Sequence, residues 1–526
     1  MKVLVTESLS EKGLEILRSA GGIEVDVRTE ATPDEIKRII GDYHALIIRS
    51  KTKVTADLLA EAKNMKVIGR AGVGIDNVDV DAATRRGIIV MNSPEGNTVS
   101  TAELTMAMIL GLSRRVPEAS ASLKRGEWER KRFVGTELMN KTLGVVGLGR
   151  IGGEVATRAA AFGMKVVGDD PFCPEERAKK LGVRMLPLDE MLRTADVITF
   201  HVPLTDDTRA MIGPEQFKLM KKGVKLVNCS RGGVIEEKAL FDAIKAGIVS
   251  GCALDVYENE PPAGSPLIAL DQVIATPHIG ASTSEAQANV ATEIARQVIG
   301  VLQGGPAKNA VNLPMMDGDG FDGLRPYIEL AEKLGMMLVQ MMGKITGKLT
   351  VSYHGEIIGR NLTPLTRAFL CGLLKPVLQP PVNMVNAAAL ARERGVEVTE
   401  VNSASAEDYT SLITVEGKVG SKTYSVSGTL FANGQPRIVR IDGLDIDVAP
   451  QGPILIIRND DKPGAISHIT TVLATRGINI ARMAVGRDEP GGKAITVLNI
   501  DEPIKDAVIR EIKELNIITD VRLVQI

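Results

Sequence analysis

The chain has few of the residues on which several classes of protein depend. Of its 526 residues, one is Trp, six are Tyr and nine are Phe, which argues against aromatic platforms that stack on nucleic-acid bases. The formal net charge is −2, so no overall attraction to nucleic acid or to an anionic membrane is expected. The hydrophobic fraction of 44% and the charged fraction of 24% are ordinary for a soluble globular protein. We therefore expect no nucleic-acid partner and no membrane partner.

Cysteine and long apolar runs are also scarce. The four cysteines, Cys173, Cys229, Cys252 and Cys371, form no C-x-x-C pair and match no zinc spacing. We expect reduced thiols and no metal site. The longest apolar run, Leu104–Leu112, is far too short to span a bilayer. The apolar run at the N-terminus stops after five residues, unlike a signal peptide. These absences predict a cytoplasmic protein.

A chain of this length exceeds one hydrophobic core, and about three to four domains are expected. Residues 1–98 alternate strands and helices, which predicts a parallel sheet with helices on both faces. The expected strands are Lys2–Thr6, Ala45–Ile48, Val67–Gly69 and Ile88–Val90, and the expected helices are Leu9–Ala20, Pro33–Ile40 and Ala56–Ala62. An apolar helix over Thr98–Ser113 leads into the next domain.

A glycine fingerprint follows the strand expected at Thr142–Val146. Gly147, Gly149 and Gly152 form G-x-G-x-x-G, a helix follows over Glu154–Phe162, and a strand restarts at Lys165–Gly168. In this order the first glycine permits a tight turn, the second lets the backbone approach a pyrophosphate, and the third lets helix pack on strand. The helix N-terminus supplies amide donors. The fingerprint predicts a dinucleotide-binding, doubly wound α/β domain.

The rest of the chain divides into segments with different patterns of predicted helices and strands. Further strands at Val197–His201, Lys225–Asn228, Gly251–Leu254 and Val273–Ala275 extend the second sheet. A helix from Ser284 to about Leu302 returns to the first domain, and 306–320 reads as a linker rich in Pro, Gly and Asp. Residues 321–449 combine two helical stretches with strands such as Thr423–Phe431 and Arg437–Ile441, an α+β pattern. Residues 450–526 have the order βαββαβ, the ferredoxin-like motif.

Three polar residues follow successive strands of the second sheet. Arg231, Glu260 and His278 come after the strands that end near residues 228, 254 and 275. Because the ligand crevice of an open α/β sheet lies beyond the carboxyl ends of its strands, these side chains can converge there. A histidine can take the hydroxyl proton in hydride transfer, a carboxylate can orient it, and an arginine can bind a carboxylate.

The motifs that carry these residues resemble those of the D-2-hydroxyacid dehydrogenases. They are GLGRIG, NCSRGGVIEE, DVYENEPP and PHIGAST, while IIRSKTKVT, VIGRAGVGIDNVD and NSPEGNTVSTAEL in the first domain resemble the branch that oxidises 3-phospho-D-glycerate. The resemblance to the long bacterial form covers the whole chain. It implies four domains: a substrate domain over 1–98 and 285–306, a Rossmann-like NAD domain over 99–284, an intervening domain over 310–449, and an ACT regulatory domain over 450–526.

The resemblance also implies residue roles. His278 is the acid/base, Glu260 its partner, and Arg231 the ligand of the substrate carboxylate. The implied substrate residues are Arg49, Ser50, Arg70, Val73, Gly74, Asn97 and Arg130, the last from the basic run 130–132, which can also be a solvated turn. The implied cofactor residues are Gly147, Gly149, Arg150, Ile151, Gly152, Asp170, His201, Pro203, Thr208, Cys229, Asp255 and Gly280. Asp169 and Asp170, with no arginine close behind, favour NAD over NADP.

The terminal unit resembles an ACT domain, which in this family binds L-serine between paired domains. Asp461 and Asn479 are the implied effector residues, one for an ammonium and one for a carboxylate. Some serine-sensitive relatives have an aromatic residue where Asn459 stands, so a purely structural dimerisation role stays open. In the intervening domain Arg437 and Arg440 are accompanied by apolar Leu444 and Ala449, which argues against an anionic effector site there.

The sequence thus predicts NAD-dependent oxidation of 3-phospho-D-glycerate to 3-phosphohydroxypyruvate, the first step of the phosphorylated route to L-serine. L-serine feedback and a homo-oligomer, a tetramer by resemblance, are expected with it. Two alternatives stay open: the same chemistry on another D-2-hydroxy acid, and a non-catalytic NAD-sensing scaffold. The set of Arg231, Glu260 and His278 argues against the scaffold.

Overall fold

The N-terminal part of the chain forms a five-stranded parallel sheet in a computed structural model that describes residues 1–314, 320–345, 347–378, 381–431 and 434–526. The strand order is β2-β1-β3-β4-β5. The strands are β1 (Lys2–Val5), β2 (Glu24–Val27), β3 (Ala45–Ile48), β4 (Val67–Arg70) and β5 (Ile89–Asn92). The helices are α1 (Glu11–Ser19), α2 (Pro33–Ile39), η1 (Ile40–Asp42), α3 (Ala56–Glu61) and α4 (Val80–Arg85). Strand β2 and helix α4 were not expected from the sequence.

The second sheet has seven parallel strands in the order β12-β11-β10-β9-β6-β7-β8. The strands are β6 (Thr142–Val146), β7 (Lys165–Asp169), β8 (Arg184–Met185), β9 (Val197–Phe200), β10 (Val224–Asn228), β11 (Val249–Leu254) and β12 (Val273–Ala275). The helices are α5 (Thr98–Arg114), α6 (Val116–Lys124), η2 (Arg130–Phe133), α7 (Arg150–Ala161), α8 (Glu175–Lys180), α9 (Leu188–Thr194), α10 (Pro214–Leu219) and α11 (Glu237–Lys245). The expected doubly wound α/β architecture is confirmed for both sheets.

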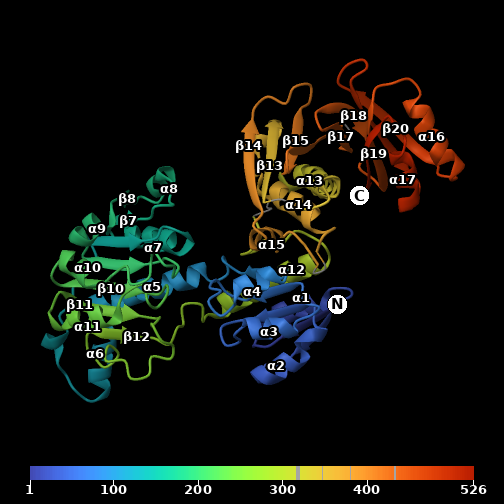
Figure 1. The fold of residues 1–526 in the computed structure, drawn as a ribbon. Helices are drawn as coiled ribbons and strands as arrows, with labels where there is room; N and C mark the ends of the chain where they lie inside the picture. The colour runs from blue at the N-terminus through green and yellow to red at the C-terminus, as the bar shows by residue number, and fades with distance from the viewer. Residues whose placement is uncertain (315–319, 346, 379–380, 432–433) are drawn as a thin grey trace.

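Helix α12 (Ser284–Leu302) returns from the second sheet to the first. Its Val290, Ile294 and Val298 share a buried cluster with Val3 and Val5 of β1. A Cβ added to Gly13 of α1 would lie 2.8 Å from Ala291 Cβ, so these two helices are in close contact. Figure 1 shows the first sheet (blue) and the second (cyan to green) side by side, joined through α5 and α12.

The segment that follows folds around a mixed six-stranded sheet of order β14-β13-β15-β16-β17-β18. Its strands are β13 (Lys348–Gly355), β14 (Glu397–Ser403), β15 (Ser411–Val419), β16 (Lys422–Leu430), β17 (Pro436–Ile441) and β18 (Leu444–Val448). Its helices are α13 (Gly320–Met342), η3 (Glu356–Gly359), α14 (Thr363–Leu374) and α15 (Ala387–Glu393). Strand β13 lies between the two long helices, so helices and strands alternate more than the sequence suggested. Of the expected linker, residues 315–319 lie outside the described residues.

The C-terminal unit has the expected βαββαβ order and an antiparallel sheet of order β20-β21-β19-β22. Its elements are β19 (Pro453–Asp460), α16 (Ala465–Thr475), β20 (Ile480–Arg487), β21 (Lys493–Ile500), α17 (Asp506–Lys513) and β22 (Ile518–Gln525). Gln340 of α13 exchanges two hydrogen bonds with Gln525 of β22, which fixes this unit against the intervening segment (orange and red in Figure 1).

Two features are absent from the described residues. No helix in them combines the length and the apolar character needed to cross a membrane. They also contain no cluster of three or more His, Cys, Asp or Glu side chains that could hold a metal ion.

Candidate active site

The three fingerprint glycines differ in what surrounds them. Gly147 has φ +87°, and a Cβ there would lie 2.6 Å from the carbonyl oxygen of His201. A Cβ at Gly152 would lie 2.0 Å from the carbonyl oxygen of Gly147, so helix α7 packs directly on the turn. A Cβ at Gly149 would meet no atom within 4 Å. Gly149 therefore leaves open space at the start of α7, where a pyrophosphate fits.

The N-terminus of α7 presents free donors to that space. Gly149 is the N-cap and supplies no side-chain cap, so the first amides of the helix are left for a ligand. Arg150, the first residue of α7, is exposed and pairs with Glu95 at 3.3 Å, and Ile151 follows it. These features fit the phosphates of a dinucleotide.

Asp170 holds the fingerprint loop in place. Its Oδ2 accepts from the Leu148 amide and its Oδ1 from the Phe172 amide, each at 2.8 Å. The structure also brings Arg177 of α8 back to this loop, where its Nε and Nη2 donate to the carbonyl oxygens of Leu148 and Gly149 at 3.4 and 3.3 Å. The expectation of no arginine close behind Asp170 was therefore wrong in space, although this guanidinium is engaged by the loop itself.

His278 and Glu260 form a hydrogen-bonded pair beyond the carboxyl end of the second sheet. His278 Nδ1 lies 2.7 Å from Glu260 Oε2, and the Tyr257 amide donates to Glu260 Oε1 at 3.2 Å. Burial of Glu260 raises its pKa, but the bond to His278, its charge, the Tyr257 amide and Arg231 outweigh burial and leave the pKa below its ordinary value. The carboxylate thus occupies Nδ1, and Nε2 of the imidazole is the nitrogen that can take a substrate proton.

Asp255 fixes the backbone that carries His278. Its Oδ1 accepts from the Thr276 hydroxyl at 2.6 Å and from the Ile279 amide at 2.8 Å, and its Oδ2 accepts from the Gly280 amide at 2.8 Å. His278 itself has φ +53°, a left-handed conformation that a side chain adopts only when its surroundings impose it. Asp255 supplies that constraint, so the structure gives it a positioning contact with the histidine loop.

Arg231 reaches from the second sheet region to the first. Its Nε donates to Asp76 Oδ2 at 3.1 Å, and its Nη1 donates to the carbonyl oxygen of Ser230 at 2.7 Å. A Cβ added to Gly74 would lie 2.0 Å from Arg231 Nη2, so the guanidinium lies against the Gly74 backbone. Among the described residues, nothing accepts a hydrogen bond from the amides of Val73 or Gly74. The Arg231 guanidinium thus lies next to two backbone amides that have no acceptor among the described residues.

Two more arginines come from the first domain. Burial lowers the pKa of Arg70 to about 10, helped by nearby Arg231 and Arg49 and opposed by Asp76 and Glu7. Arg70 therefore keeps its charge at neutral pH. Arg49 donates through Nη1 to the carbonyl oxygen of Ser8 at 3.3 Å, and Ser50 is exposed beside it. Asn97 forms the N-cap of α5, and its buried Oδ1 has no partner in the described part of the chain.

Among the remaining expected cofactor residues, His201 directly follows β9 and Cys229 directly follows β10 of the second sheet. Burial lowers the pKa of His201 to about 3, so this imidazole is neutral, and its Nε2 lies 3.0 Å from the Thr199 hydroxyl. Thr208 donates to the carbonyl oxygen of Pro203 at 2.6 Å. Burial raises the pKa of Cys229 to about 12, which keeps it a thiol. His201 therefore lacks the protonation behaviour of a catalytic base at neutral pH.

Arg130 does not join the other substrate residues within this chain. It lies in η2, is exposed, and forms no ion pair with any described residue. Its neighbour Arg132 pairs with Glu129 at 3.0 Å and with Asp271 at 3.7 Å.

In the C-terminal unit the two expected effector residues are engaged by their own chain. Asp461 accepts from Arg487 Nη1 and from the Gly491 amide, both at 3.0 Å, and these contacts lower its pKa. Asn479 donates to Asp501 Oδ2 at 2.7 Å. The cations of the intervening segment are also neutralised locally, because Arg440 pairs with Glu407 and Asp445 and Arg437 with Asp447.

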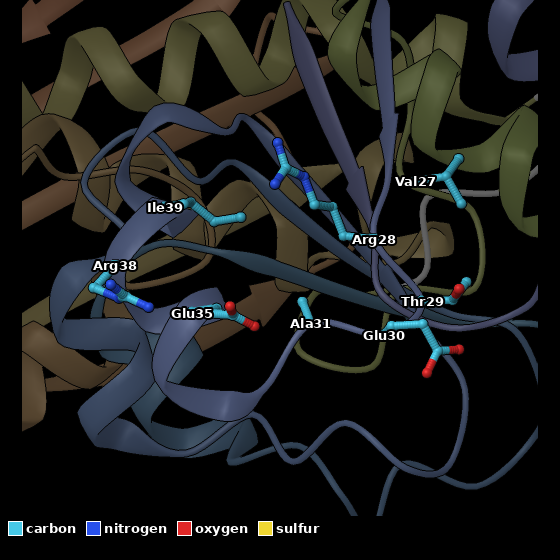
Figure 2. Close-up of a pocket in the computed structure, with 8 residues that line it drawn as sticks. All are labelled: Val27, Arg28, Thr29, Glu30, Ala31, Glu35, Arg38 and Ile39. Atoms are coloured by element: carbon cyan, nitrogen blue, oxygen red, sulfur yellow. The ribbon is translucent and has the colours of Figure 1, made fainter.

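A separate groove of about 580 Å³ lies at the end of β2. Figure 2 shows its lining, with Arg38 and Ile39 on α2. It is formed by Val27, Arg28, Thr29, Glu30, Ala31, Glu35, Arg38 and Ile39. Glu35 is engaged by the Thr32 capping box and Arg28 by Asp26. None of the site residues described above lines this groove.

Comparisons with known proteins identify the family of the chain. The model of the D-isomer specific 2-hydroxyacid dehydrogenase NAD-binding domain matches residues 106–280, that of the D-3-phosphoglycerate dehydrogenase intervening domain matches 323–442, and that of the ACT domain matches 454–516. The chain is 46% identical to D-3-phosphoglycerate dehydrogenase of Methanocaldococcus jannaschii, with 100% of each covered. It is 43% identical to that of Bacillus subtilis, with 100% of this chain and 99% of the relative covered.

Solved structures resemble the first two sheets. A Thermus thermophilus protein has a TM-score of 0.55 at 38% identity and covers 59% of this chain, over 100% of its own length. A D-lactate dehydrogenase of Aquifex aeolicus, solved with NAD and lactic acid, has a TM-score of 0.54 at 30% identity and covers 60% of this chain, over 100% of its own.

These matches show that the chain is an NAD-dependent oxidoreductase. The chain belongs to the D-isomer-specific 2-hydroxyacid dehydrogenases and, within them, to the D-3-phosphoglycerate dehydrogenase family.

Proposed function

We propose that this chain oxidises 3-phospho-D-glycerate to 3-phosphohydroxypyruvate, the first step of the phosphorylated route to L-serine. The observation that carries the proposal is the charge of the cleft. The charges of Arg49 and Arg231 both act on Arg70, and the amides of Val73 and Gly74, next to Arg231, have no acceptor among the described residues. A substrate with a carboxylate at one end and a phosphate at the other supplies the anions that such a set of cations needs.

Each catalytic group has one task in this reaction. His278 Nε2 takes the proton of the C2 hydroxyl, and the ionised Glu260 at 2.7 Å stabilises the imidazolium that forms. When bound, NAD would supply the acceptor for the hydride of C2. Arg231 and the amides of Val73 and Gly74 hold the substrate carboxylate and orient C2 toward the histidine. Arg49, Arg70 and Ser50 hold the phosphate, and Asn97 contacts the substrate.

The proposed cofactor residues are supported by the family resemblance and by the open space at Gly149. We assign the pyrophosphate to Gly147, Gly149, Gly152 and the first turn of α7 with Arg150 and Ile151, and the adenosine ribose to Asp170. His201, Pro203, Thr208, Cys229, Asp255 and Gly280 line the nicotinamide side. The domain limits proposed are 1–98 with 285–306, 99–284, 310–449 and 450–526.

Steady-state kinetics tests the substrate. We expect kcat/KM, followed by NADH absorbance, to be at least about a hundredfold higher for 3-phospho-D-glycerate than for D-glycerate or D-lactate, because unpaired buried cations penalise a substrate that lacks the phosphate. Arg70→Lys should remove most of this preference, whereas Arg85→Ala, at an exposed arginine of α4, should keep it. Equal rates on all three substrates would instead favour another D-2-hydroxy acid. NAD binding without turnover of any of them would favour a scaffold.

Arg130 needs a second copy of the chain to reach a substrate. The segment around it exposes large apolar side chains, Val116, Leu123, Trp128 and Val134, the last two with 77% and 78% exposure. We propose that this segment packs on a second copy in a homo-oligomer, a tetramer by family resemblance, and delivers Arg130 to the neighbouring phosphate site. Analytical ultracentrifugation should show an oligomer without detectable monomer, and Trp128→Ser should shift it toward smaller species. Arg130→Ala should leave the oligomer intact and raise the KM for 3-phospho-D-glycerate.

We propose L-serine as the effector of the C-terminal unit. Asp461 precedes α16 and Asn479 follows it, and this helix of 11 residues is about 16 Å long. One small zwitterion can therefore touch both residues only where two copies meet, with its ammonium displacing Arg487 from Asp461. L-serine should inhibit the wild type and not Asp461→Asn, with D-serine as the control. Full activity at saturating L-serine would leave the unit a dimerisation module.

A further inference from the structure

The loop that carries Arg49 and Ser50 is built around one buried carboxylate. Glu7 follows β1 and has 8% exposure. Its Oε1 accepts from the amides of Arg49 and Thr52, each at 2.9 Å, and its Oε2 accepts from those of Ser50 and Lys51 at 3.1 and 3.0 Å. Four successive backbone donors therefore converge on a single side chain. Burial opposes ionisation of Glu7, but these bonds outweigh it and lower its pKa.

A second side chain, that of Asn77, donates hydrogen bonds to the backbone carbonyl groups of the same loop. Asn77 Nδ2 donates to the carbonyl oxygen of Arg49 at 2.9 Å and to that of Thr52 at 2.7 Å. Strands β1 and β3 are hydrogen-bonded neighbours with Val5 opposite Ile47, so Glu7 and Arg49 emerge side by side at the same sheet edge. The backbone of the loop is thus fixed by the carboxylate of Glu7 and the amide group of Asn77.

The occupied amides restrict how an anion can be bound here. Successive backbone N–H groups at a strand end commonly cradle a phosphate. In this loop all four point to Glu7, so they cannot bind a phosphate while that carboxylate is in place. Recognition must fall to side chains, chiefly to the guanidinium of Arg49, whose Cα position is set by the Glu7 contacts.

We propose that Glu7 is a positioning residue that determines specificity for the phosphorylated substrate by fixing the Arg49–Thr52 loop. It acts through Arg49 and touches neither substrate nor cofactor. The inference rests on the proposed function, since it assigns the phosphate of that substrate to this loop. It predicts that damage to Glu7 changes phosphate recognition alone.

The test compares substrates within one variant. In Glu7→Gln the amide group turns two donors toward backbone donors, which displaces the loop. We expect the KM for 3-phospho-D-glycerate to rise roughly tenfold to a hundredfold, the range produced by misplacement of a binding group by about 1 Å. The kcat/KM for D-glycerate and the Kd for NAD should stay within about twofold of wild type. Glu61→Gln, which removes an exposed carboxylate of α3 in the same domain, is the matched control and should change none of these values.

Asn77→Ala provides an independent arm if Glu7→Gln does not fold. It frees the two loop carbonyls, and it should raise the KM for 3-phospho-D-glycerate while leaving D-glycerate turnover in place. An unchanged KM in a folded Glu7→Gln enzyme, or an equal loss with both substrates and with NAD, would overturn the inference. A wild-type enzyme that shows no preference for the phosphorylated substrate would overturn the proposed function instead, so the two failures are distinguishable.

Discussion

Two alanine substitutions in the dinucleotide fingerprint should have opposite signatures. In Gly152→Ala the new Cβ lies 2.0 Å from the Gly147 carbonyl oxygen, whereas ordinary contact begins near 3.4 Å. Turn and helix must therefore separate by about 1.4 Å, because the obstructing atom is backbone. Such overpacking costs about 1–3 kcal/mol. For a domain of this size each kcal/mol lowers the melting temperature by roughly 2–4 °C, and the displaced turn also weakens NAD binding.

Gly149→Ala places its methyl group in open space, with φ −64° at that residue. The ligand-free protein should therefore melt within about 1 °C of wild type, since nothing is displaced. The same methyl group occupies the approach of the pyrophosphate, so the Kd for NAD should rise at least about tenfold, or roughly 1.4 kcal/mol. Calorimetric melting without NAD and titration calorimetry with NAD measure the two effects. Wild-type NAD affinity in Gly149→Ala, or wild-type stability in Gly152→Ala, would refute the reasoning.

Three further substitutions test the site and its surroundings. Glu260→Gln should lower kcat by roughly 10²–10⁴-fold, since the imidazolium loses its charged partner, with an unchanged Kd for NAD; a kcat near wild type would contradict the pair. Asp170→Asn removes the charge and one of the two acceptors for the loop amides, so the ratio of NADP to NAD affinity, measured by titration, should rise. Burial and nearby Glu95 raise the pKa of Glu293 from 4.5 to about 7, so the folded protein binds a proton that the unfolded chain releases, and stability falls as pH rises between these values. Discounted for its partial exposure, Glu293→Gln should stabilise by about 1 kcal/mol at pH 8 and by little near pH 4.5; equal gains in melting temperature at both pH values would contradict this.

The sequence was most informative where one element is buried on both faces. Strands such as β3, with all four residues buried, read as continuous apolar runs that need no tertiary information. Strand β2 has the sequence EVDV, is partly exposed, and pairs only with β1 at the sheet edge. Nothing in its composition distinguishes it from a loop, because the neighbouring strand supplies its stability. Strand β13 does carry the alternating pattern of a half-buried strand, but this single strand stands in the sequence between two helices and was missed.

The site shows the same division. Arg231, Glu260 and His278 could be predicted because each follows a strand, and parallel strands end at one edge. Glu7, Asp76 and Arg177 were missed, since their roles depend on contacts between segments 42, 155 and 28–29 residues apart. A signal for Glu7 was present: a carboxylate directly after the first strand lies on the same edge as the arginine after β3. The sequence alone does not show that β1 and β3 are neighbours in the sheet, and the signal could be used only once that pairing was known.

Two ion pairs join the first sheet region to the second, and both use an arginine that faces an expected anion. Arg231 pairs with Asp76 at 3.1 Å, and Arg150 pairs with Glu95 at 3.3 Å. Exposed pairs of this kind contribute little free energy, about 0–1 kcal/mol, so they do not lock the cleft. Under the roles proposed above, the substrate carboxylate meets Arg231 and the pyrophosphate meets Arg150. Each ligand thus brings a negative charge to its arginine. Without the ligand, a carboxylate of the first sheet region, Asp76 or Glu95, supplies that negative charge. Each arginine therefore has a carboxylate partner before its ligand binds, and the carboxylate that is then released, Asp76 or Glu95, is exposed enough to be solvated by water.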